Sequence, residues 1–268
     1  MGIGDALSGI QGRLRPAGLL YSTYEHSLLA GLDKSRLPHH VAVMADGNRR
    51  WARLNAPGET LTAGYQAGAV KLREFVSWCD EVGIQIVTLW VLSPNNLDRP
   101  DEEVLPLLDV IVELVESLAD EGKWSIQIVG ALDLLPADTS QALREASART
   151  QGFSGMHVNV AVSYAGRQEL RDAFRSLLAA EEAKGTSLED LSQTLEIDMI
   201  ASHLYTAGQP DPDLIIRTSG EQRLSDFLIW QSAHSEFYFC EALWPDFRRV
   251  DFLRALRSFA QRERRFGR

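Results

Sequence analysis

The chain has 268 residues, of which 45% are apolar and 24% are charged, an ordinary balance for a globular protein. Acidic residues outnumber basic ones by 37 to 27, and the net charge is −10. Nucleic acid is therefore not an expected partner, because neutralising its phosphates needs a net basic face. The length suits one large α/β domain or two small ones, and the uniform composition of the two halves favours one.

The sequence contains neither an expected membrane span nor an expected signal peptide, and this predicts where the protein is located. No window approaches about 18 consecutive apolar residues, so no membrane span is expected. Asp5 stands early, and no basic start precedes an apolar run, which argues against a signal peptide. A cytoplasmic location is the resulting expectation.

The predicted elements alternate along the chain. Residues 1–35 form an N-terminal arm, in which an amphipathic helix over 19–32 is expected to pack on the domain or, less commonly, to touch a membrane surface. Within residues 36–268, short apolar runs predict strands at 40–45, 84–92, 125–129, 157–164, 214–217 and 236–239. Helical spacing predicts helices at 63–82, 102–120, 139–150, 168–183, 188–204 and 251–262. This order predicts an α/β fold, a single domain with a mostly parallel central sheet flanked by helices.

Polar side chains follow three of the predicted strands. Right-handed crossovers bring the ends of parallel strands to one edge of the sheet, where ligands bind in such folds. The residues concerned are Asp46, Gly47, Asn48, Arg49 and Arg50 after the first strand, Ser93, Asn96 and Arg99 after the second, and Arg217, Arg223 and Ser225 after a later one. Arginines suit forked bonds to phosphate oxygens, and Asp46 suits Mg²⁺, which commonly takes one or two protein carboxylates. We therefore expect an anion site that includes a hard cation.

Each of these motifs alone has an ordinary structural explanation. Asp-Gly-Asn is a common turn, and Arg-Thr-Ser-Gly-Glu could be a surface loop with an exposed ion pair. Their occurrence at successive strand ends favours a site. Neither G-x-G-x-x-G nor G-x-x-x-x-G-K-[ST] is present, so the familiar nucleotide-binding folds are not supported.

From about residue 40 to the C-terminus the chain resembles the cis-prenyltransferases, the family of undecaprenyl diphosphate synthase and the short-chain Z-isoprenyl diphosphate synthases. The segments that carry the resemblance are HVAVMADGNRRWA, GYQAGAVKLREFVSWCDEVGI, LSPNNLDRPDEEV, HVNVAVSYAGRQEL and DLIIRTSGEQRLSDFLIWQSAHSEFYFCEALWPDF. The resemblance implies the cis-prenyltransferase fold over residues 36–268. It also implies a Mg²⁺-dependent condensation of isopentenyl diphosphate with an allylic diphosphate, carried out by a homodimer.

The resemblance also implies roles for single residues. Asp46 and Asn96 match catalytic positions, the asparagine being implicated in removal of a proton, and Asp46 and Glu236 match metal ligands. Substrate-binding positions are matched by Gly47, Asn48, Arg49, Arg50, Trp51, Ser93, Leu97, Arg99, Arg217, Arg223 and Ser225. The closing Arg265-Phe266-Gly267 resembles a C-terminal segment that reaches the active site of the partner in a dimer.

Several positions depart from the long-chain members of the family. Arg49 stands where many members have glycine, Leu97 replaces a usual tryptophan, and Val91 is bulkier than the usual small residue. Leu61, Tyr65 and Gln222 stand where long-chain members often have arginine, histidine and histidine. These departures resemble the actinobacterial short-chain branch, which makes Z,E-farnesyl diphosphate, with geranyl diphosphate as the expected primer. A bulkier tunnel wall would stop elongation by steric block.

Four alternatives remain open at this stage. The first is a long-chain undecaprenyl or decaprenyl diphosphate synthase, and the second is an irregular synthase that joins two dimethylallyl units. The third is a non-catalytic subunit of the family, although such subunits lose the Asp-Gly-Asn loop that is present here. The fourth is a generic phosphate-binding α/β protein.

Overall fold

The computed structural model describes the backbone of residues 16–262 and the side chains of residues 23–262. The start of the N-terminal arm and the closing Arg265-Phe266-Gly267 segment lie outside the described residues. Six strands form one sheet in the order β3-β4-β2-β1-β5-β6, and every neighbouring pair is parallel. The strands are β1 (His40–Met44), β2 (Ile86–Trp90), β3 (Ser125–Val129), β4 (His157–Ala161), β5 (Leu214–Arg217) and β6 (Glu236–Phe239).

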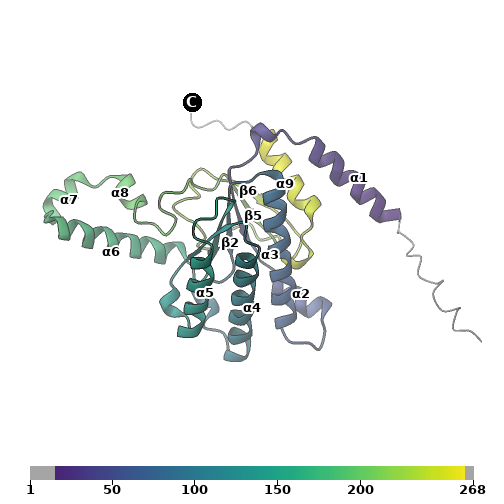
Figure 1. Ribbon diagram of the computed structural model, residues 1–268, viewed down its shortest axis with the longest axis horizontal. Helices are drawn as coiled ribbons and strands as arrows, with labels where there is room; N and C mark the ends of the chain where they lie inside the picture. Colours follow the sequence, from purple (N-terminus) through teal and green to yellow (C-terminus); the bar gives the residue numbers. More distant parts are fainter. Residues whose placement is uncertain (1–15, 263–268) are drawn as a thin grey trace, which may run out of the picture.

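The helices that connect and flank these strands are shown in Figure 1. They are α1 (Pro16–Ala30), α2 (Asn48–Asn55), α3 (Thr62–Val82), α4 (Asp101–Asp120), α5 (Ala137–Arg149), α6 (Gly166–Lys184), α7 (Leu188–Thr194), α8 (Ile197–Ala201) and α9 (Arg249–Gln261), with short 3₁₀ turns at η1 (Lys34–Arg36), η2 (Pro94–Asn96), η3 (Leu132–Leu134) and η4 (Trp244–Asp246). The predicted α/β fold with a parallel sheet flanked by helices is confirmed.

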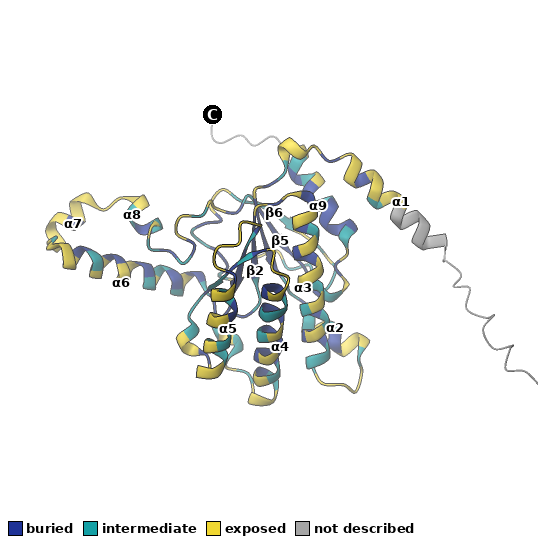
Figure 2. Cartoon of the chain, in the orientation of Figure 1, coloured by how far each residue is buried: buried dark blue, intermediate teal, exposed yellow. Residues whose placement is uncertain are grey.

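The two faces of the sheet are covered differently. Alternate strand residues such as Val43, Leu89 and Val160 pack with α3, α4, α5 and α9 in the larger hydrophobic core. The strand residues that alternate with them, such as Met44 and Ala161, point to the other face of the sheet and pack in a smaller hydrophobic cluster. Much of that second face is covered by irregular chain between α8 and β6, and Figure 2 shows the sheet buried between these layers.

The structure differs from the sequence prediction in two connections. Residues 48–55, for which no helix was predicted, form the helix α2, because Gly47 turns the chain at φ 112° and helical backbone begins at the next residue. The single helix expected over 188–204 is divided into α7 and α8, because Leu195 and Glu196 are extended between them.

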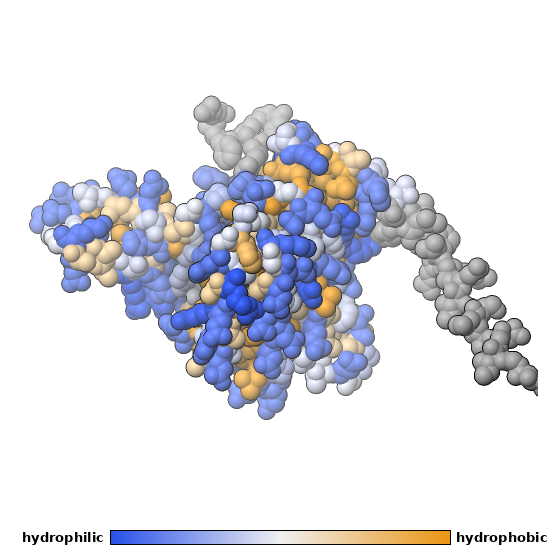
Figure 3. Space-filling view, in the orientation of Figure 1, coloured by the Kyte–Doolittle hydropathy of each residue, from blue (hydrophilic) through white to orange (hydrophobic). Residues whose placement is uncertain are grey.

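The N-terminal helix packs on the domain, which is the favoured expectation from the sequence. α1 lies beside α9, and Leu28 reaches the core. The guanidinium of Arg254 lies 5.3 Å from the ring centre of Tyr24. In Figure 3 hydrophilic residues cover most of the visible face. No helix within residues 16–262 is both long and apolar enough to cross a bilayer.

Candidate active site

Asp46 stands at the carboxyl end of β1, and the neighbouring strand end holds it in place. Its N–H donates to Thr218 Oγ1 at 3.0 Å, and that hydroxyl donates back to the carbonyl of Asp46 at 2.8 Å. Thr218 directly follows β5, which pairs with β1. These two hydrogen bonds are therefore a consequence of the strand order. They leave the Asp46 side chain 40% exposed and directed into a cavity.

Gly47 and α2 form the next part of the site. A Cβ on Gly47 would lie 2.9 Å from Leu243 Cδ2, so both the positive φ and the close approach require glycine. The Nδ2 of Asn48 donates to the carbonyl of Ala45 at 3.1 Å and fastens the start of α2 to the strand end. The first N–H groups of a helix have no partner within it and favour anions. α2 therefore begins at the cavity with a positively polarised end.

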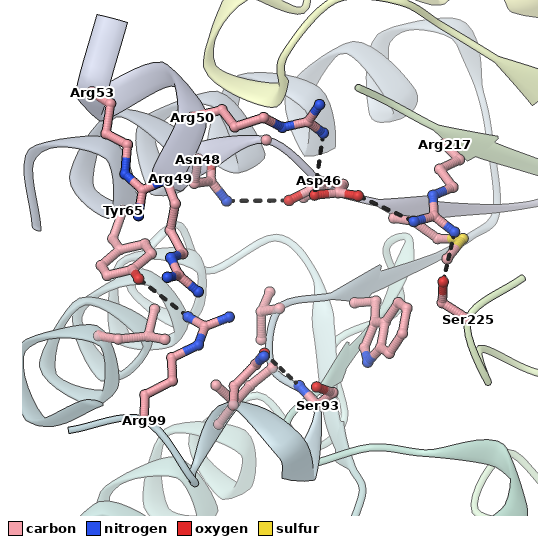
Figure 4. A pocket seen from close by; sticks show the side chains of 18 residues that line it. Asp46, Asn48, Arg49, Arg50, Arg53, Tyr65, Ser93, Arg99, Arg217 and Ser225 are labelled. Atoms are coloured by element: carbon pink, nitrogen blue, oxygen red, sulfur yellow. Dashed lines mark hydrogen bonds and ion pairs between the residues drawn. The ribbon is translucent and has the colours of Figure 1, made fainter. Parts of the chain in front are cut away.

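A cavity of about 430 Å³ gathers the ends of β1, β2 and β5 (Figure 4). Its polar lining includes Asp46, Asn48, Arg49, Arg50, Arg53, Tyr65, Ser93, Asn96, Arg99, Arg217 and Ser225. Five of these residues are arginines and only one, Asp46, is acidic. In a chain of net charge −10 this is a local concentration of positive charge, as a polyanionic ligand requires.

Arg217 connects two parts of the cavity. Its side chain is 4% exposed; one terminal nitrogen donates to Asp46 Oδ2 at 3.1 Å and the other to Ser225 Oγ at 2.8 Å. The same guanidinium also donates to the backbone carbonyl of Arg223. A buried arginine held at three acceptors has a fixed orientation, so the loop after β5 and the carboxylate after β1 are positioned together.

The polar turn after β2 is fixed by one side chain. Asn96 Oδ1 accepts a hydrogen bond of 3.1 Å from the N–H of Ser93, across η2. This bond uses one of the two lone pairs of the amide oxygen and orients the amide, so that its NH₂ can donate to a ligand. This suits contact with a diphosphate oxygen.

One carboxylate at the cavity rim holds two arginines. Glu103 Oε1 accepts from Arg99 at 3.0 Å and from the Tyr65 hydroxyl at 2.5 Å, and Arg49 Nε lies 3.4 Å from it. Arg99 also donates to the Tyr65 oxygen at 3.1 Å. Burial, together with the hydrogen bond to Glu103, raises the pKa of Tyr65 well above its ordinary value, so the phenol stays a donor.

An apolar hollow of about 30 Å³ continues from the cavity between α3 and α4. The two spaces share Ala45, Asn48, Tyr65, Val91 and Leu107 in their linings. The walls of the hollow are completed by Gly68, Ala69, Leu72, Val110, Ile111 and Leu114. A cationic mouth that opens onto an apolar seam matches the polarity of a ligand with an anionic head and a hydrocarbon tail, and the seam has to widen to admit the tail.

Four residues implicated by the resemblance do not line this cavity. Trp51 turns away and donates to Asp246 Oδ1 at 2.8 Å, while Leu97 packs partly buried against the main core. Arg223 is 66% exposed and donates to Glu221 Oε2 at 2.6 Å.

The fourth residue, Glu236, lies apart from Asp46 in the same chain, and its role as a metal ligand stays a prediction. It is the first residue of β6 and pairs in register with Leu214, whereas Asp46 follows the opposite end of β1, beyond the level of Arg217. Three residues of strand correspond to roughly 10 Å, so the two carboxylates of one chain cannot share a metal ion. Arg262 pairs with Glu236 at that end.

The structure adds residues that the sequence did not single out. Arg53 extends the arginine row of Arg49 and Arg50 by one turn of α2, which was not predicted as a helix. Trp90 ends β2 and lines the cavity. Its strand-end position was a signal that could have identified it. Thr218 could not be chosen from the sequence, because its role depends on which strand lies beside β1.

The donor set bears on whether a metal ion could be held. Within the described residues no group of three or more His, Cys, Asp or Glu side chains gathers around one point. Asp46 Oδ1 has only Arg50 near it, at 4.0 Å, and is therefore available. A single carboxylate fits Mg²⁺ when diphosphate oxygens and water complete its octahedron, and does not fit a metal caged entirely by protein.

Comparison with known proteins agrees with this geometry. A (2Z,6E)-farnesyl diphosphate synthase of Thermobifida fusca is 58% identical over 251 residues, which is 92% of this chain and 97% of the relative. A short-chain Z-isoprenyl diphosphate synthase of Mycobacterium leprae is 50% identical over 251 residues, 92% of this chain and 95% of the relative.

A solved structure and a family model extend the comparison. The crystal structure of lavandulyl diphosphate synthase from Lavandula x intermedia, in complex with dimethylallyl diphosphate, matches with a TM-score of 0.80 and 34% identity, covering 87% of this chain and 100% of that one. The Prenyltransf model, which describes undecaprenyl diphosphate synthase, matches residues 44–267. The chain therefore belongs to the undecaprenyl diphosphate synthase family and is a prenyltransferase.

Proposed function

We propose that this prenyltransferase condenses isopentenyl diphosphate with an allylic diphosphate, most simply geranyl diphosphate, and releases a short Z-prenyl diphosphate of about three isoprene units. Two similar proteins are named as synthases of short Z-prenyl diphosphates, which supports this product class. The observation that carries the proposal is the cationic cavity joined to a small apolar hollow.

The two diphosphates would occupy different parts of the cavity. The allylic diphosphate would lie at the start of α2, against Arg49, Arg50 and the exposed oxygen of Asp46. Isopentenyl diphosphate would lie between the turn after β2 and the loop after β5. The contacts available there are Ser93, Asn96, Arg217 and Ser225. Arg223 would have to leave Glu221 to join them, and we keep it in the proposal on that condition.

The chemistry requires charge stabilisation and positioning. The allylic carbon–oxygen bond breaks and releases diphosphate, and a new carbon–carbon bond forms to the terminal carbon of isopentenyl diphosphate. The resulting cation loses a proton from its C2 carbon to the released diphosphate, and the new double bond forms there. Asp46 would hold Mg²⁺, which would supply stabilisation of the negative charge that develops on the leaving diphosphate. Preorganised arginines act on the same charge. Asn96 would orient a diphosphate through its NH₂ and so assist the loss of the proton to the released diphosphate.

Product length would be set by the apolar hollow. The tail of a growing chain would enter between α3 and α4, where Val91 narrows the entrance and Leu72 and Leu114 lie farthest along the two helices. At 1.5 Å per residue, Leu72 stands about 10 Å along α3 from Tyr65. A long polyprenyl chain would have to displace core side chains, which close packing resists.

A homodimer is part of the same proposal. The arm formed by α6, α7 and α8 projects from the body of the domain (Figure 1). It exposes the large apolar side chains Phe174, Leu178, Leu188, Leu195 and Ile197. An exposed apolar surface of this kind supports an interface between copies. Sedimentation of the purified chain at several concentrations would test it, and a monomer at micromolar concentration would contradict it.

The decisive test is product analysis. The enzyme is incubated with geranyl diphosphate, excess isopentenyl diphosphate and Mg²⁺, and the products are dephosphorylated and separated by chain length and double-bond geometry. The expected product is one C15 alcohol with a new Z double bond. A dominant product beyond about C20 would support the long-chain alternative, because the hollow would then yield to the chain. Turnover without isopentenyl diphosphate would support the irregular alternative.

A further inference from the structure

The loop that carries Ser225 has an unusual backbone. Three of its residues that are not glycine have positive φ: Ser225 at 48°, Asp226 at 72° and Leu228 at 45°. Such conformations cost free energy for residues with a Cβ, least for Asp and Asn, and persist only where surrounding structure holds them. Contacts outside this short loop must therefore maintain its shape.

Two contacts hold the ends of this strained segment. The guanidinium of Arg217 donates to Ser225 Oγ at 2.8 Å. The ring of Phe227, fully buried, stacks on Trp90 with centroids 5.0 Å apart and meets the edge of Tyr164 at 6.0 Å. Asp226 stands between these two residues, so its own contacts decide how the exposed Ser225 is joined to the buried Phe227.

Asp226 binds the start of α6, a helix that begins about 60 residues earlier in the chain. Its carbonyl accepts from the N–H of Gly166 at 2.7 Å, and its carboxylate Oδ1 accepts from the N–H of Arg167 at 3.0 Å. These are the first two N–H groups of α6, which have no partner within the helix. The residue before them, Ala165, has no side chain that could cap the helix. Asp226 supplies the missing cap from another part of the chain.

The approach of the loop to the helix depends on a glycine. A Cβ on Gly166 would lie 2.7 Å from Ile229 Cγ1 and 3.1 Å from the carbonyl oxygen of Asp226. Any larger residue would force the loop away from the helix start. The close contact therefore depends on glycine at position 166 of the helix and on the position of Asp226 and Ile229 in the loop.

The helix start is itself firmly anchored, so it can serve as a fixed point. Glu169, 1% exposed on the first turns of α6, accepts the Tyr164 hydroxyl at 2.5 Å and the N–H of Tyr205 at 2.9 Å. Gln231 Nε2 lies 3.1 Å from both of its oxygens. A carboxylate with this many donors fixes the helix relative to β4 and to the chain after α8.

We propose that the carboxylate of Asp226 is a positioning residue for the isopentenyl diphosphate end of the site. By capping α6 it holds the strained loop so that Ser225 and the Arg217 guanidinium keep the geometry that binds the diphosphate. The inference rests on the proposed function, which assigns these two residues to isopentenyl diphosphate. Asp226 does not line the cavity and acts through its neighbour.

Two substitutions separate the cap from the backbone conformation. Asp226→Asn keeps a side-chain oxygen acceptor and the tolerance of positive φ. Asp226→Gly keeps the conformation and the carbonyl that accepts from Gly166, and it removes the side-chain acceptor of the Arg167 N–H. Steady-state kinetics would be measured for each substrate at saturation of the other. Asp226→Gly should raise the KM for isopentenyl diphosphate by up to about tenfold, the equivalent of a lost helix cap. The KM for the allylic substrate should stay within about twofold.

Asp226→Asn should restore the wild-type KM within about twofold, because the capping oxygen is kept. A matched control is Ser187→Ala, which removes the cap of α7, where Ser187 Oγ accepts from the N–H of Asp190 at 3.1 Å. This control should lower the melting temperature without changing either KM, since Ser187 does not line the cavity.

Three results would overturn the proposal. In the first, Asp226→Gly leaves the KM for isopentenyl diphosphate unchanged while the wild type is active. In the second, it raises both KM values equally, as general destabilisation would. In the third, the wild type does not condense the two substrates, and this result alone also overturns the proposed function.

Discussion

Two polar clusters lie on the same sheet and have opposite characters. The cluster at the carboxyl ends of the strands contains five arginines and Asp46, and it faces a cavity of about 430 Å³. The cluster on the second face, toward the amino ends, is uncharged, and its residues range from half-buried to fully buried. It consists of His40, Thr88, Gln127, His157, Asn159 and Gln209. The first keeps groups available for a ligand, whereas the second satisfies its hydrogen bonds internally.

The direction of the hydrogen bonds explains the second cluster. Pro210 can only accept through its carbonyl, so His40 Nδ1 donates to it at 2.8 Å and Nε2 is left to accept from Thr88 Oγ1, also at 2.8 Å. Thr88 in turn accepts from Asn159 Nδ2 at 3.0 Å. This chain requires a neutral imidazole, and burial lowers the pKa of His40 to about 4. Polar residues of one sheet therefore serve ligand binding at the carboxyl ends of the strands and folding toward the amino ends.

The largest expected effect comes from the carboxyl end. Asp46→Ala should lower kcat by about a thousandfold or more, because it removes the only acidic side chain lining the cavity and the proposed metal ligand. The free energy of unfolding should fall by no more than about 2 kcal/mol, because the Asp46 side chain is 40% exposed and the buried Arg217 keeps two of its three acceptors. Kinetics and urea unfolding on one preparation would measure both. A loss of stability as large as the loss of activity would abolish the distinction between the two clusters.

Arg217→Lys should have the next largest effect. Lysine keeps the charge but cannot reach Asp46, Ser225 and the Arg223 carbonyl with one planar group. We expect kcat/KM for isopentenyl diphosphate to fall by about a hundredfold. Arg53→Lys is a suitable control, because Arg53 lines the same cavity, and a small effect is expected. Similar losses in both variants would show that charge alone matters.

Asn159→Ala, at the other end of the sheet, should have the opposite effect: it should lower stability and leave activity nearly unchanged. Its fully buried amide bonds to Thr88 and Gln209. Removing it takes one buried partner from each, so that Thr88 keeps His40 and Gln209 keeps Gln127 and His157. The free energy of unfolding should fall by about 2–3 kcal/mol. At a temperature where the variant is folded, kcat should stay within about threefold of the wild type. A stable but inactive variant would place this cluster in the catalytic machinery.

The pH dependence of stability sharpens the same contrast without any substitution in the wild type. The pKa of His40 is about 4 in the folded chain and about 6.5 in the unfolded one. The unfolded state therefore binds more protons between these values, so the stability contributed by neutral His40 is present above pH 6.5 and is lost as the pH falls toward 4. The loss should approach roughly 3 kcal/mol. His40→Gln cannot titrate, and chemical unfolding from pH 7 to pH 4 should show a shallower decline for it.

Much of the cluster at the carboxyl end could be predicted because strand ends are visible in a sequence. Apolar runs located β1, β2 and β5, and the polar residues that follow them came together in one cavity. α2 was missed because its residues, NRRWARLN, have no continuous apolar stripe. The position of Glu236 could have been recognised, since it begins a predicted strand and must stand at the amino end of a parallel sheet.

Other features depend on tertiary contacts that no local pattern encodes. The bonds of Tyr65 and Arg49 to Glu103 require the starts of α3 and α4 to meet at α2. The cap that Asp226 provides joins positions about 60 residues apart. The uncharged cluster combines side chains from four strands with Gln209, so its members look like unrelated polar residues in the sequence.

The central claim is that Asp46 and the arginines form a metal-dependent diphosphate site. Binding of inorganic diphosphate, measured by calorimetry with Mg²⁺ and again with a chelator, tests this claim most directly. The wild type should lose at least about tenfold in affinity when the metal is removed, and Asp46→Ala should bind weakly with no such dependence. An Asp46→Ala variant that keeps the full dependence on Mg²⁺ would contradict the account.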